Sequence, residues 1–334
     1  MPNNQLIITK DGSHSLFSQK HGVSYHSKYG AIQETQHVFI NAGFQHKIPT
    51  ASLSILGIGF GTGLNAFMTF LESKKQEVDI NYIGVEAYPL SLETIKEFNF
   101  SEILKEEESV FQKIHALDWE TPHALNDHFQ LTKMKMMIED IDFKNQFDLI
   151  YFDAFGPGSQ PELWEESILQ KMYDALKIDG VLTTYCAKGS VKRGLKKVGF
   201  TIQALPGPPG KREMTRAVKM ELPEIEIEGD NSKEGFLNVD VFSKEAPTEI
   251  EKETIAIVNE EISNGFLSIQ FNTKKTGKTA NVKMLGIDGN VLLDKNIPVT
   301  STVQNLDIQA ISNGNYFVAI KFGDHIKTSL ITKI

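Results

Sequence analysis

Short apolar runs alternate with longer amphipathic segments between residues 52 and 220, and this alternation restricts the possible folds more than any other feature. Four runs rich in β-branched and aromatic residues have the length of strands buried on both faces. They are SLSILGIGF (52–60), NYIGVEA (81–87), FDLIYFDAF (147–155) and GVLTTYC (180–186). The segments between them repeat apolar residues with a helical period. They are TGLNAFMTFLES (62–73), PLSLETIKEF (89–98), PELWEESILQKMYDAL (161–176) and SVKRGLKKVG (190–199).

This order of elements predicts an α/β fold. Parallel strands are joined by crossover helices, so the expected architecture is a doubly wound, mostly parallel sheet with helices on both faces. A helix is also expected over AIQETQHVFINAG (31–43), and a third strand over KMKMMIED (133–140). Ligands of such sheets bind beyond the carboxyl ends of the strands. The residues at those ends are therefore the candidates for function.

The pattern changes to period two from about residue 263, which predicts a second domain. Short alternating strands separated by Gly, Asn and Asp turns are typical of a small antiparallel β-sandwich. The expected strands are FLSIQFN, ANVKMLGID, NVLLDKN, NYFVAIKFG and KTSLITKI. We therefore predict one domain over residues 1–220, an acidic linker over 221–262, and a sandwich over 263–334.

The net charge of −9 is unevenly distributed along the chain. Residues 221–262 carry thirteen acidic side chains and three lysines, whereas residues 188–219 carry nine Lys or Arg and one acid, Glu213. Overall acidity therefore does not exclude a polyanionic partner, because the predicted α/β domain has a basic strip.

The remaining composition indicates a cytoplasmic protein. The single cysteine, Cys186, excludes internal disulfides and cysteine-based metal clusters. The nine histidines show no metal-ligand spacing, so we expect no metal. No apolar run approaches the roughly 18–20 residues that span a bilayer, and MPNNQLIITKDG lacks the basic and apolar regions of a signal peptide. We therefore expect no membrane partner.

A glycine-rich turn follows the first predicted strand and opens a helix. Gly59, Gly61 and Gly63 permit a tight turn and a close approach of backbone to ligand at a helix N-terminus. A dinucleotide site needs G-x-G-x-x-G to hold a pyrophosphate, but here the third glycine arrives one place early. The spacing favours S-adenosylmethionine, whose tail has no pyrophosphate, and a purely structural turn is the alternative. Asn65, in the helix that follows, is assigned to the same cofactor site.

Acidic residues end two further predicted strands. Glu86 ends the second strand, where a carboxylate can accept hydrogen bonds from both ribose hydroxyls of a cofactor. Asp140 ends the predicted third strand and is a candidate acceptor for an adenine amino group, with Glu139 as the alternative. A surface acid at a strand end is the other reading of each.

Asp153 ends the strand over 147–155 and is the candidate catalytic residue. Methyl transfer from a sulfonium needs a nucleophile with a free lone pair, and a carboxylate can orient an amine and accept its proton. Gly156 and Gly158 leave room beside Asp153 for a flat substrate. A helix cap is the alternative for Asp153. Cys186 would suggest pyrimidine C5-methylation if it were a nucleophile, but a small buried hydrophobic residue is the more common role.

The basic strip is the signal for nucleic acid. Lys192, Arg193, Lys196 and Lys197 would lie largely on one helix, and Lys211 and Arg212 follow in a glycine–proline loop. Basic side chains on one face neutralise phosphates. A solvated helix face is the alternative.

These segments together resemble the tRNA 5-(aminomethyl)uridine methyltransferases, either the methyltransferase half of MnmC-like enzymes or the stand-alone MnmD-like form. The matching segments, in order, are GAIQETQHVFINAG, LGIGFGTGLNAF, FDAFGPGSQPELW, GSVKRGLKKVGFTIQ and GPPGKREM. The resemblance implies a Rossmann-like methyltransferase that uses S-adenosylmethionine to convert aminomethyl to methylaminomethyl on the wobble uridine of tRNA. Asp153 then corresponds to the aspartate of the family's catalytic pocket. Lys211, Arg212 and Glu213 lie in its signature loop near the substrate.

The chain departs from the family pattern in two places. Gly57 stands where methyltransferases usually carry an acid, and Glu34 or the backbone is the expected substitute. No second glycine fingerprint follows residue 220, so we expect no flavin and an aminomethyluridine substrate made directly upstream.

The tail carries a separate resemblance. LGIDGNVLLDKNI and the segment from Ile311 to Ile334 resemble the C-terminal sorting domain of type IX secretion in Bacteroidetes. We interpret it as an appended sandwich of unknown use and not as an export signal. Two alternatives to the main hypothesis stay open: a methyltransferase of the same fold that acts on a small amine or a protein, and a non-catalytic secreted or binding module led by the tail.

Overall fold

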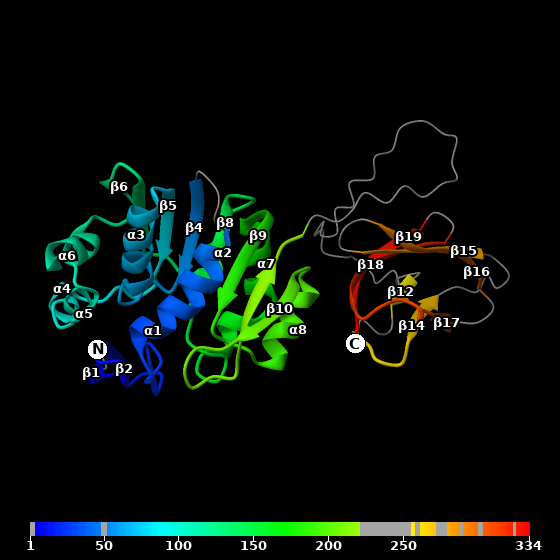
Figure 1. Cartoon of the computed structure of the whole chain (residues 1–334), viewed down its shortest axis with the longest axis horizontal. Coiled ribbons are helices and arrows are strands. Elements are labelled where there is room, and N and C mark those ends of the chain that lie inside the picture. The colour runs from blue at the N-terminus through cyan, green and yellow to red at the C-terminus, as the bar shows by residue number, and fades with distance from the viewer. Residues whose placement is uncertain are drawn as a thin grey trace. The chain divides into compact units, whose positions relative to one another are not determined.

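The computed structural model of the chain describes residues 4–47, 52–220, 255–257, 261–271, 279–286, 290–299, 303–322 and 325–334. The chain forms two compact units, Met1–Glu221 and Leu222–Ile334 (Figure 1). Among the helices of these described residues, none is long and apolar enough to cross a membrane.

The first unit is built on a sheet of eight strands in the order β10-β11-β9-β8-β4-β5-β7-β6. The five central strands run parallel: β4 (Ser52–Ile58), β5 (Asp79–Val85), β7 (Phe129–Met134), β8 (Phe147–Phe152) and β9 (Leu176–Thr184). Antiparallel strands flank them: β6 (Pro122–Asn126), β10 (Thr201–Pro206) and β11 (Glu213–Val218). All four apolar runs predicted as strands are confirmed, and the order places the ends of β5, β4 and β8 next to one another.

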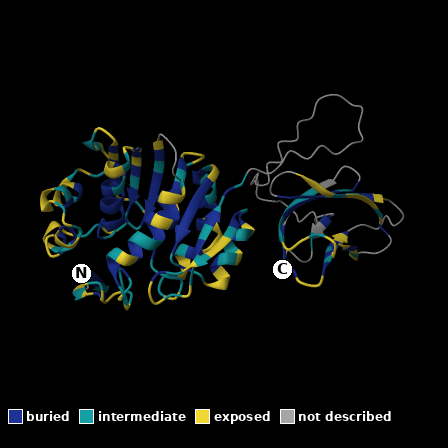
Figure 2. Cartoon of the chain, viewed as in Figure 1, coloured by how far each residue is buried: buried dark blue, intermediate teal, exposed yellow. Residues whose placement is uncertain are grey.

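Helices cover both faces of this sheet, as predicted. One face packs on α1 (Ala31–Thr35), the π-helix η1 (Gln36–Phe44), α3 (Leu64–Gln76), α5 (Phe100–Leu104) and α6 (Glu108–Ala116). The other packs on α7 (Glu166–Ala175) and α8 (Gly189–Lys197). The side chains of successive residues in a strand point to opposite faces of the sheet, and each face has its own apolar core. In β4, Ile55 lies in the core that contains α3, and Leu56 lies in the core that contains α7. Figure 2 shows these strands buried between the helical layers.

Several predicted elements differ from the structure. The helix expected over 31–43 is a longer run in which α1 continues into η1 and then α2 (Gln45–Lys47). The strand expected over 133–140 is wrong: β7 ends at Met134, and Ile138–Asp140 is the 3-10 helix η2. The segment 89–98 forms only one short helix, α4 (Leu92–Ile95), and 161–164 is the 3-10 helix η3 before α7. The hairpin of β10 and β11 was not predicted.

A small N-terminal sheet of β1 (Gln5–Ile8), β2 (His14–Ser18) and β3 (Val23–Ser24) precedes α1. Leu16 of β2 is buried in the core that contains α3. The chain after β3 is thereby brought to the glycine turn, because a Cβ added at Gly61 would lie 3.6 Å from the ring of Tyr25.

The second unit is an all-β structure with two sheets around one core, as predicted. One sheet has the order β12-β14-β17 and the other β13-β19-β18-β15-β16. The strands are β12 (Ile255–Ile257), β13 (Glu261–Ile262), β14 (Phe266–Phe271), β15 (Thr279–Gly286), β16 (Val291–Pro298), β17 (Val303–Asp307), β18 (Gly314–Phe322) and β19 (His325–Lys333). The predicted linker over 221–262 is too long, because β12 pairs with β14 and β13 pairs with β19. Residues 221–254, which hold most of the acids of that stretch, lie outside the described residues.

Candidate active site

The glycine turn adopts a conformation that other residues would strain. Gly59, Gly61 and Gly63 have φ values of 79°, 51° and 73°, in the left-handed region that favours glycine. A Cβ on Gly59 would lie 2.8 Å from the carbonyl oxygen of Asp153, and one on Gly63 would lie 2.5 Å from His115 Nε2. The turn therefore packs directly against the end of β8 and opens α3, which is the backbone cradle predicted for a cofactor.

Glu86 follows β5 and contacts this turn. Its Oε2 accepts a hydrogen bond of 2.9 Å from the Gly61 N–H, and its Oε1 accepts one of 2.9 Å from the Tyr88 N–H. Each carboxylate oxygen has a further lone pair, so Glu86 retains capacity for ribose hydroxyls. The turn and Glu86 thus fit the group for which they were predicted.

The carboxylates of Asp140 and Glu139 make no hydrogen bond to the glycine turn or Glu86 among the described residues. Both are exposed in η2, beyond the last residue of β7. Strand β7 ends before Met136, Met137 and Ile138. The last backbone hydrogen bond along this strand is the one that Met134 O accepts from the Glu86 N–H. Either carboxylate stays a prediction for adenine, in a 3-10 helix and not at a strand end.

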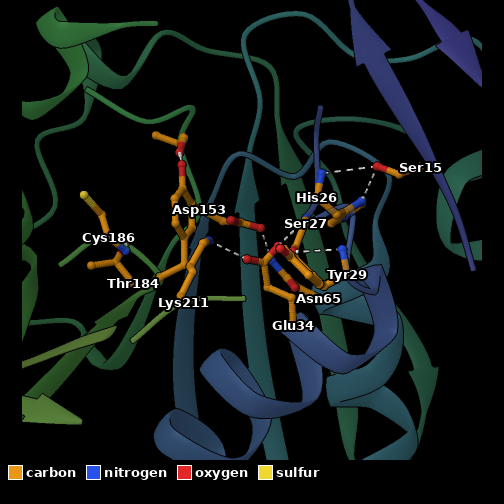
Figure 3. Close-up of polar contacts among 12 residues, drawn as sticks. Ser15, His26, Ser27, Tyr29, Glu34, Asn65, Asp153, Thr184, Cys186 and Lys211 are labelled. Carbon is orange, nitrogen blue, oxygen red and sulfur yellow. Dashed lines mark hydrogen bonds and ion pairs between the residues drawn. The ribbon is translucent and has the colours of Figure 1, made fainter. Parts of the chain in front are cut away.

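Asp153 is held at the end of β8 by a chain of hydrogen bonds that begins in α1. The Thr35 hydroxyl donates to Asn65 Oδ1 at 3.0 Å, and Asn65 Nδ2 donates to Asp153 Oδ2 at 2.8 Å. Figure 3 shows Asn65 and Asp153 facing each other. Among the described residues, no donor bonds to Asp153 Oδ1. Asn65, predicted to hold cofactor, therefore orients the carboxylate and leaves one oxygen open to a ligand.

The surroundings of Asp153 raise the proton affinity of its carboxyl group. Burial raises the pKa of its carboxyl well above the ordinary value, and the nearby negative charge of Glu34 raises it further. The hydrogen bond from Asn65 and the positive charge of Lys211 act in the opposite direction. A carboxylate with raised proton affinity is suited to accept a proton from an ammonium group.

Gly57, where an acid is usual, is required by packing. A Cβ at this position in β4 would lie 2.3 Å from the Tyr82 hydroxyl oxygen. Burial raises the pKa of Tyr82 well above its ordinary value, so this phenol is neutral. The predicted substitute, Glu34, is bonded to Lys211 and to the Ser27 N–H, both at 2.7 Å.

Side chains from three separate parts of the chain contact the segment that follows Asp153. The Tyr185 hydroxyl donates to Ala154 O at 2.8 Å, and Trp164 Nε1 donates to Phe155 O at 2.8 Å. The Phe155 ring lies 5.1 Å from each of the rings of His21 and Tyr25, measured between centroids. These contacts form an aromatic wall beside the catalytic candidate, with the N-terminal sheet on its outer side.

Cys186 is buried, and burial raises the pKa of its thiol. A raised thiol pKa disfavours the nucleophilic thiolate. This supports the structural role for Cys186.

The predicted basic residues divide into paired and exposed ones. Lys192 donates to Glu213 at 2.8 Å, and Lys211 is bonded to Glu34. Arg193 and Arg212 are exposed. Of these four basic side chains, Arg193 and Arg212 are therefore the two that have no carboxylate partner among the described residues.

The sequence did not indicate the roles of Thr35, Tyr185 and His26. Thr35 and Glu34 lie within GAIQETQHVFINAG, one of the segments that carry the family resemblance. Their place in that segment is the signal in the sequence that could have pointed to a role at the site. Nothing local marks Tyr185 or His26, because their partners lie in other elements.

His26 makes the stability of the first unit sensitive to acid. Its Nδ1 lies 3.1 Å from Ser15 Oγ and its Nε2 3.2 Å from Thr62 Oγ1, inside the glycine turn. Burial lowers its pKa to about 4. The neutral form is favoured in the folded state, so its contribution is complete above pH 6.5 and is lost as pH falls toward 4. Between pH 8 and pH 5 we expect a loss of about 2 kcal/mol in the free energy of unfolding.

Chemical unfolding followed by tryptophan fluorescence measures this effect, because both tryptophans, Trp119 and Trp164, lie in the first unit. His26→Gln should remove this part of the acid sensitivity. His128→Gln, at an exposed histidine paired with Asp79, is the matched control and should retain it. Equal pH dependence in wild type and His26→Gln would contradict the assignment.

Comparison with known proteins bears on both units. Residues 99–220 match the family model of S-adenosyl-L-methionine-dependent methyltransferases, and residues 263–333 match that of the secretion system C-terminal sorting domain. The chain is 28% identical over 265 residues to the tRNA 5-methylaminomethyl-2-thiouridine biosynthesis bifunctional protein MnmC of Leptospira borgpetersenii, with 75% of this chain and 39% of that protein covered. MnmC of Hydrogenovibrio crunogenus is 27% identical, with 57% and 30% covered.

Among solved structures, MnmC2 from Aquifex aeolicus aligns with a TM-score of 0.54 and 25% identity, over 68% of this chain and 74% of that one. The α/β unit therefore has the Rossmann-like fold of S-adenosylmethionine-dependent methyltransferases, and both resemblances seen in the sequence are confirmed. The chain spans about two fifths of the length of the Leptospira relative.

Proposed function

We propose that this chain is a methyltransferase that N-methylates 5-aminomethyl-(2-thio)uridine at the wobble position of tRNA, with S-adenosylmethionine as the methyl donor. The observation that carries the proposal is the open Oδ1 of Asp153, held by Asn65 beside the glycine turn and Glu86. This arrangement places Asp153, which could accept a proton, beside the glycine turn and Glu86, which could bind the cofactor. The similarity to MnmC proteins of tRNA 5-methylaminomethyl-2-thiouridine biosynthesis supports the substrate class.

The residues of the site would divide the work as follows. Gly59, Gly61 and Glu86 would hold the cofactor, which supplies an electrophilic methyl group on a sulfonium. Asp153 Oδ1 accepts an N–H of the substrate amine, which directs the nitrogen lone pair toward the methyl carbon. Methyl transfer would break the bond between the methyl carbon and the sulfonium sulfur, release the neutral thioether and form the N–C bond, and Asp153 would take the proton that the nitrogen then loses. The Phe155 wall excludes water from one side. Amine methylation is redox-neutral, so the proposed reaction requires no flavin, and the sulfonium is already an activated electrophile, so we propose that no metal takes part.

The decisive experiment is nucleoside mass spectrometry on tRNA that carries the unmethylated aminomethyl group. Incubation with the full chain and cofactor should convert aminomethyluridine to the form heavier by one methylene. Unchanged nucleoside would refute the proposal. Equal methylation of the free nucleoside would favour an enzyme for small amines, whereas activity restricted to tRNA supports the proposal.

We expect Arg193 and Arg212 to contact tRNA phosphates, since both are exposed and neither is paired with a carboxylate among the described residues. Alanine at either position should weaken tRNA binding and reduce the slope of log affinity against log salt by about 1. Fluorescence anisotropy with labelled tRNA at several salt concentrations measures this. Lys197→Ala is the control on the same helix, because Lys197 is bonded to Glu166 at 2.5 Å. An unchanged slope in both arginine variants would remove them from the interface.

We also propose that the enzyme acts in the cytoplasm, which a tRNA substrate favours. The sorting-domain match of residues 263–333 favours export of the same chain. Immunodetection of the full chain in fractionated native cells separates the two. Protein found only outside the cell would overturn the cytoplasmic proposal.

A further inference from the structure

A partly buried ion pair lies next to Asp153. Glu34, only 5% exposed, accepts hydrogen bonds on both oxygens, from Lys211 Nζ and from the Ser27 N–H, each at 2.7 Å. Glu34 belongs to α1, and Lys211 to the loop between β10 and β11. Figure 3 shows the pair beside Asp153 and Asn65. Two residues 177 positions apart are thus joined at the proposed catalytic group.

Lys211 is fixed by a second contact. Its ammonium lies 3.8 Å from the centroid of the Tyr185 ring, a cation–π geometry. The hydroxyl of the same tyrosine is bonded to Ala154 O, one residue after Asp153. The ammonium of Lys211 is therefore held between Glu34 and the Tyr185 ring, and 33% of its side chain remains exposed.

The loop that carries Lys211 is also held at its backbone. Gly210 has a φ of 85°, and a Cβ there would lie 2.2 Å from the ring of Tyr29. Pro206 O lies 2.8 Å from His37 Nε2. Residues from the N-terminal region thereby set the position of Lys211 relative to Asp153.

We propose that Glu34 and Lys211 form a positioning pair that sets the electrostatic field at Asp153 and so its capacity to take the proton of the substrate amine. The inference rests on the proposed function. The other groups that face Asp153 are neutral: the amide of Asn65 from α3, the phenol of Tyr82 from β5 and the phenol of Tyr185 after β9. Burial raises the pKa of both phenols. The charges at Asp153 therefore come from the pair.

The two members act in opposite directions, which permits a sharp test. Glu34→Gln leaves the Lys211 charge uncompensated, which stabilises the Asp153 carboxylate and should move the acid limb of the kcat profile to lower pH. Lys211→Met leaves Glu34 uncompensated and should move it to higher pH. Each displacement should be roughly one pH unit. The double variant should return close to wild type, and Lys211→Arg should stay there.

The measurement is kcat against pH at saturating tRNA and cofactor, with a parallel NMR titration of the carboxyl carbon of Asp153 in ¹³C-Asp-labelled protein, assigned by its absence in Asp153→Asn. Tryptophan fluorescence melts identify folded variants. If Glu34→Gln does not fold, the direction of the Lys211→Met shift alone decides. Opposite shifts support the pair.

The inference is overturned if the acid limb of the kcat profile moves in neither single variant, or if it moves in the same direction in both. It is also overturned by a Lys211→Met variant that loses only tRNA affinity and salt dependence, because that identifies Lys211 as a phosphate ligand. If the wild type methylates no tRNA, the proposed function fails, and the NMR titration still decides whether the pair controls the charge of Asp153.

Discussion

Replacing Asp153 with asparagine should lower kcat for tRNA methylation by roughly 10²–10⁴-fold, the range in which general-base catalysis contributes. Asn65 Nδ2 donates to Oδ2 of Asp153. In the variant, the side-chain oxygen would accept this bond and the new NH₂ group would face the substrate. An amide in that orientation donates to the amine and cannot take its proton. Single-turnover methylation with saturating enzyme measures the effect without interference from product release.

The matched control is Asp148→Asn, in the same strand. Asp148 accepts a bond of 2.8 Å from the Ser54 N–H and pairs with Lys177 at 3.0 Å, away from the carboxyl end of β8. This variant should lose some stability and keep its rate. Cofactor binding by calorimetry and the fluorescence melt should be close to wild type in Asp153→Asn. A folded Asp153→Asn protein with an undiminished rate would exclude Asp153 from proton transfer.

Gly59→Ala should produce the second large effect, the loss of cofactor binding. Its φ of 79° strains an alanine, and its Cβ would approach Asp153 O to 2.8 Å. Relief requires the ends of β4 and β8 to separate, which displaces both the turn and the catalytic candidate. We expect the unit to lose about 1–3 kcal/mol of stability and the affinity for S-adenosylmethionine to fall by at least about tenfold, as an energetic change of that size implies.

Gly22→Ala separates the two causes of this effect. Gly22 has a φ of 67°, and a Cβ there would meet no atom within 4 Å. Alanine at position 22 would have the same backbone strain as alanine at position 59 but would collide with no neighbouring atom. Gly22→Ala should therefore cost some stability and leave cofactor affinity unchanged. Isothermal titration of both variants compares them directly. Wild-type affinity in Gly59→Ala would show that the turn does not hold the cofactor.

The parts of the fold that the sequence predicted are those set by local patterns. The four apolar runs over 52–60, 81–87, 147–155 and 180–186 became strands, because a strand buried on both faces needs apolar residues at nearly every position. The prediction failed at 133–140, where Met136, Met137 and Ile138 continue the apolar run after β7 has ended. Composition cannot locate that end, since the last pairing partner belongs to β5.

In the candidate site too, local sequence patterns predicted some features, and contacts between distant residues set the others. Asp153, Glu86 and the glycine turn could be placed together from the sequence, because parallel strands bring their carboxyl ends to one edge. The sequence predicts a cofactor contact for Asn65, and the structure adds its hydrogen bonds to Asp153 and Thr35. The direction of an amide depends on which donors and acceptors surround it, and these come from α1 and β8.

By itself, the sequence therefore determined the layered α/β architecture, the appended β-sandwich, and the position of one carboxylate at the edge where a cofactor binds. These follow from periodicity and from chain direction, which are local properties. Only the tertiary structure decided how that carboxylate is charged and which of its oxygens is open. Those properties depend on burial and on Glu34, Asn65 and Lys211, which folding brings together from distant parts of the chain.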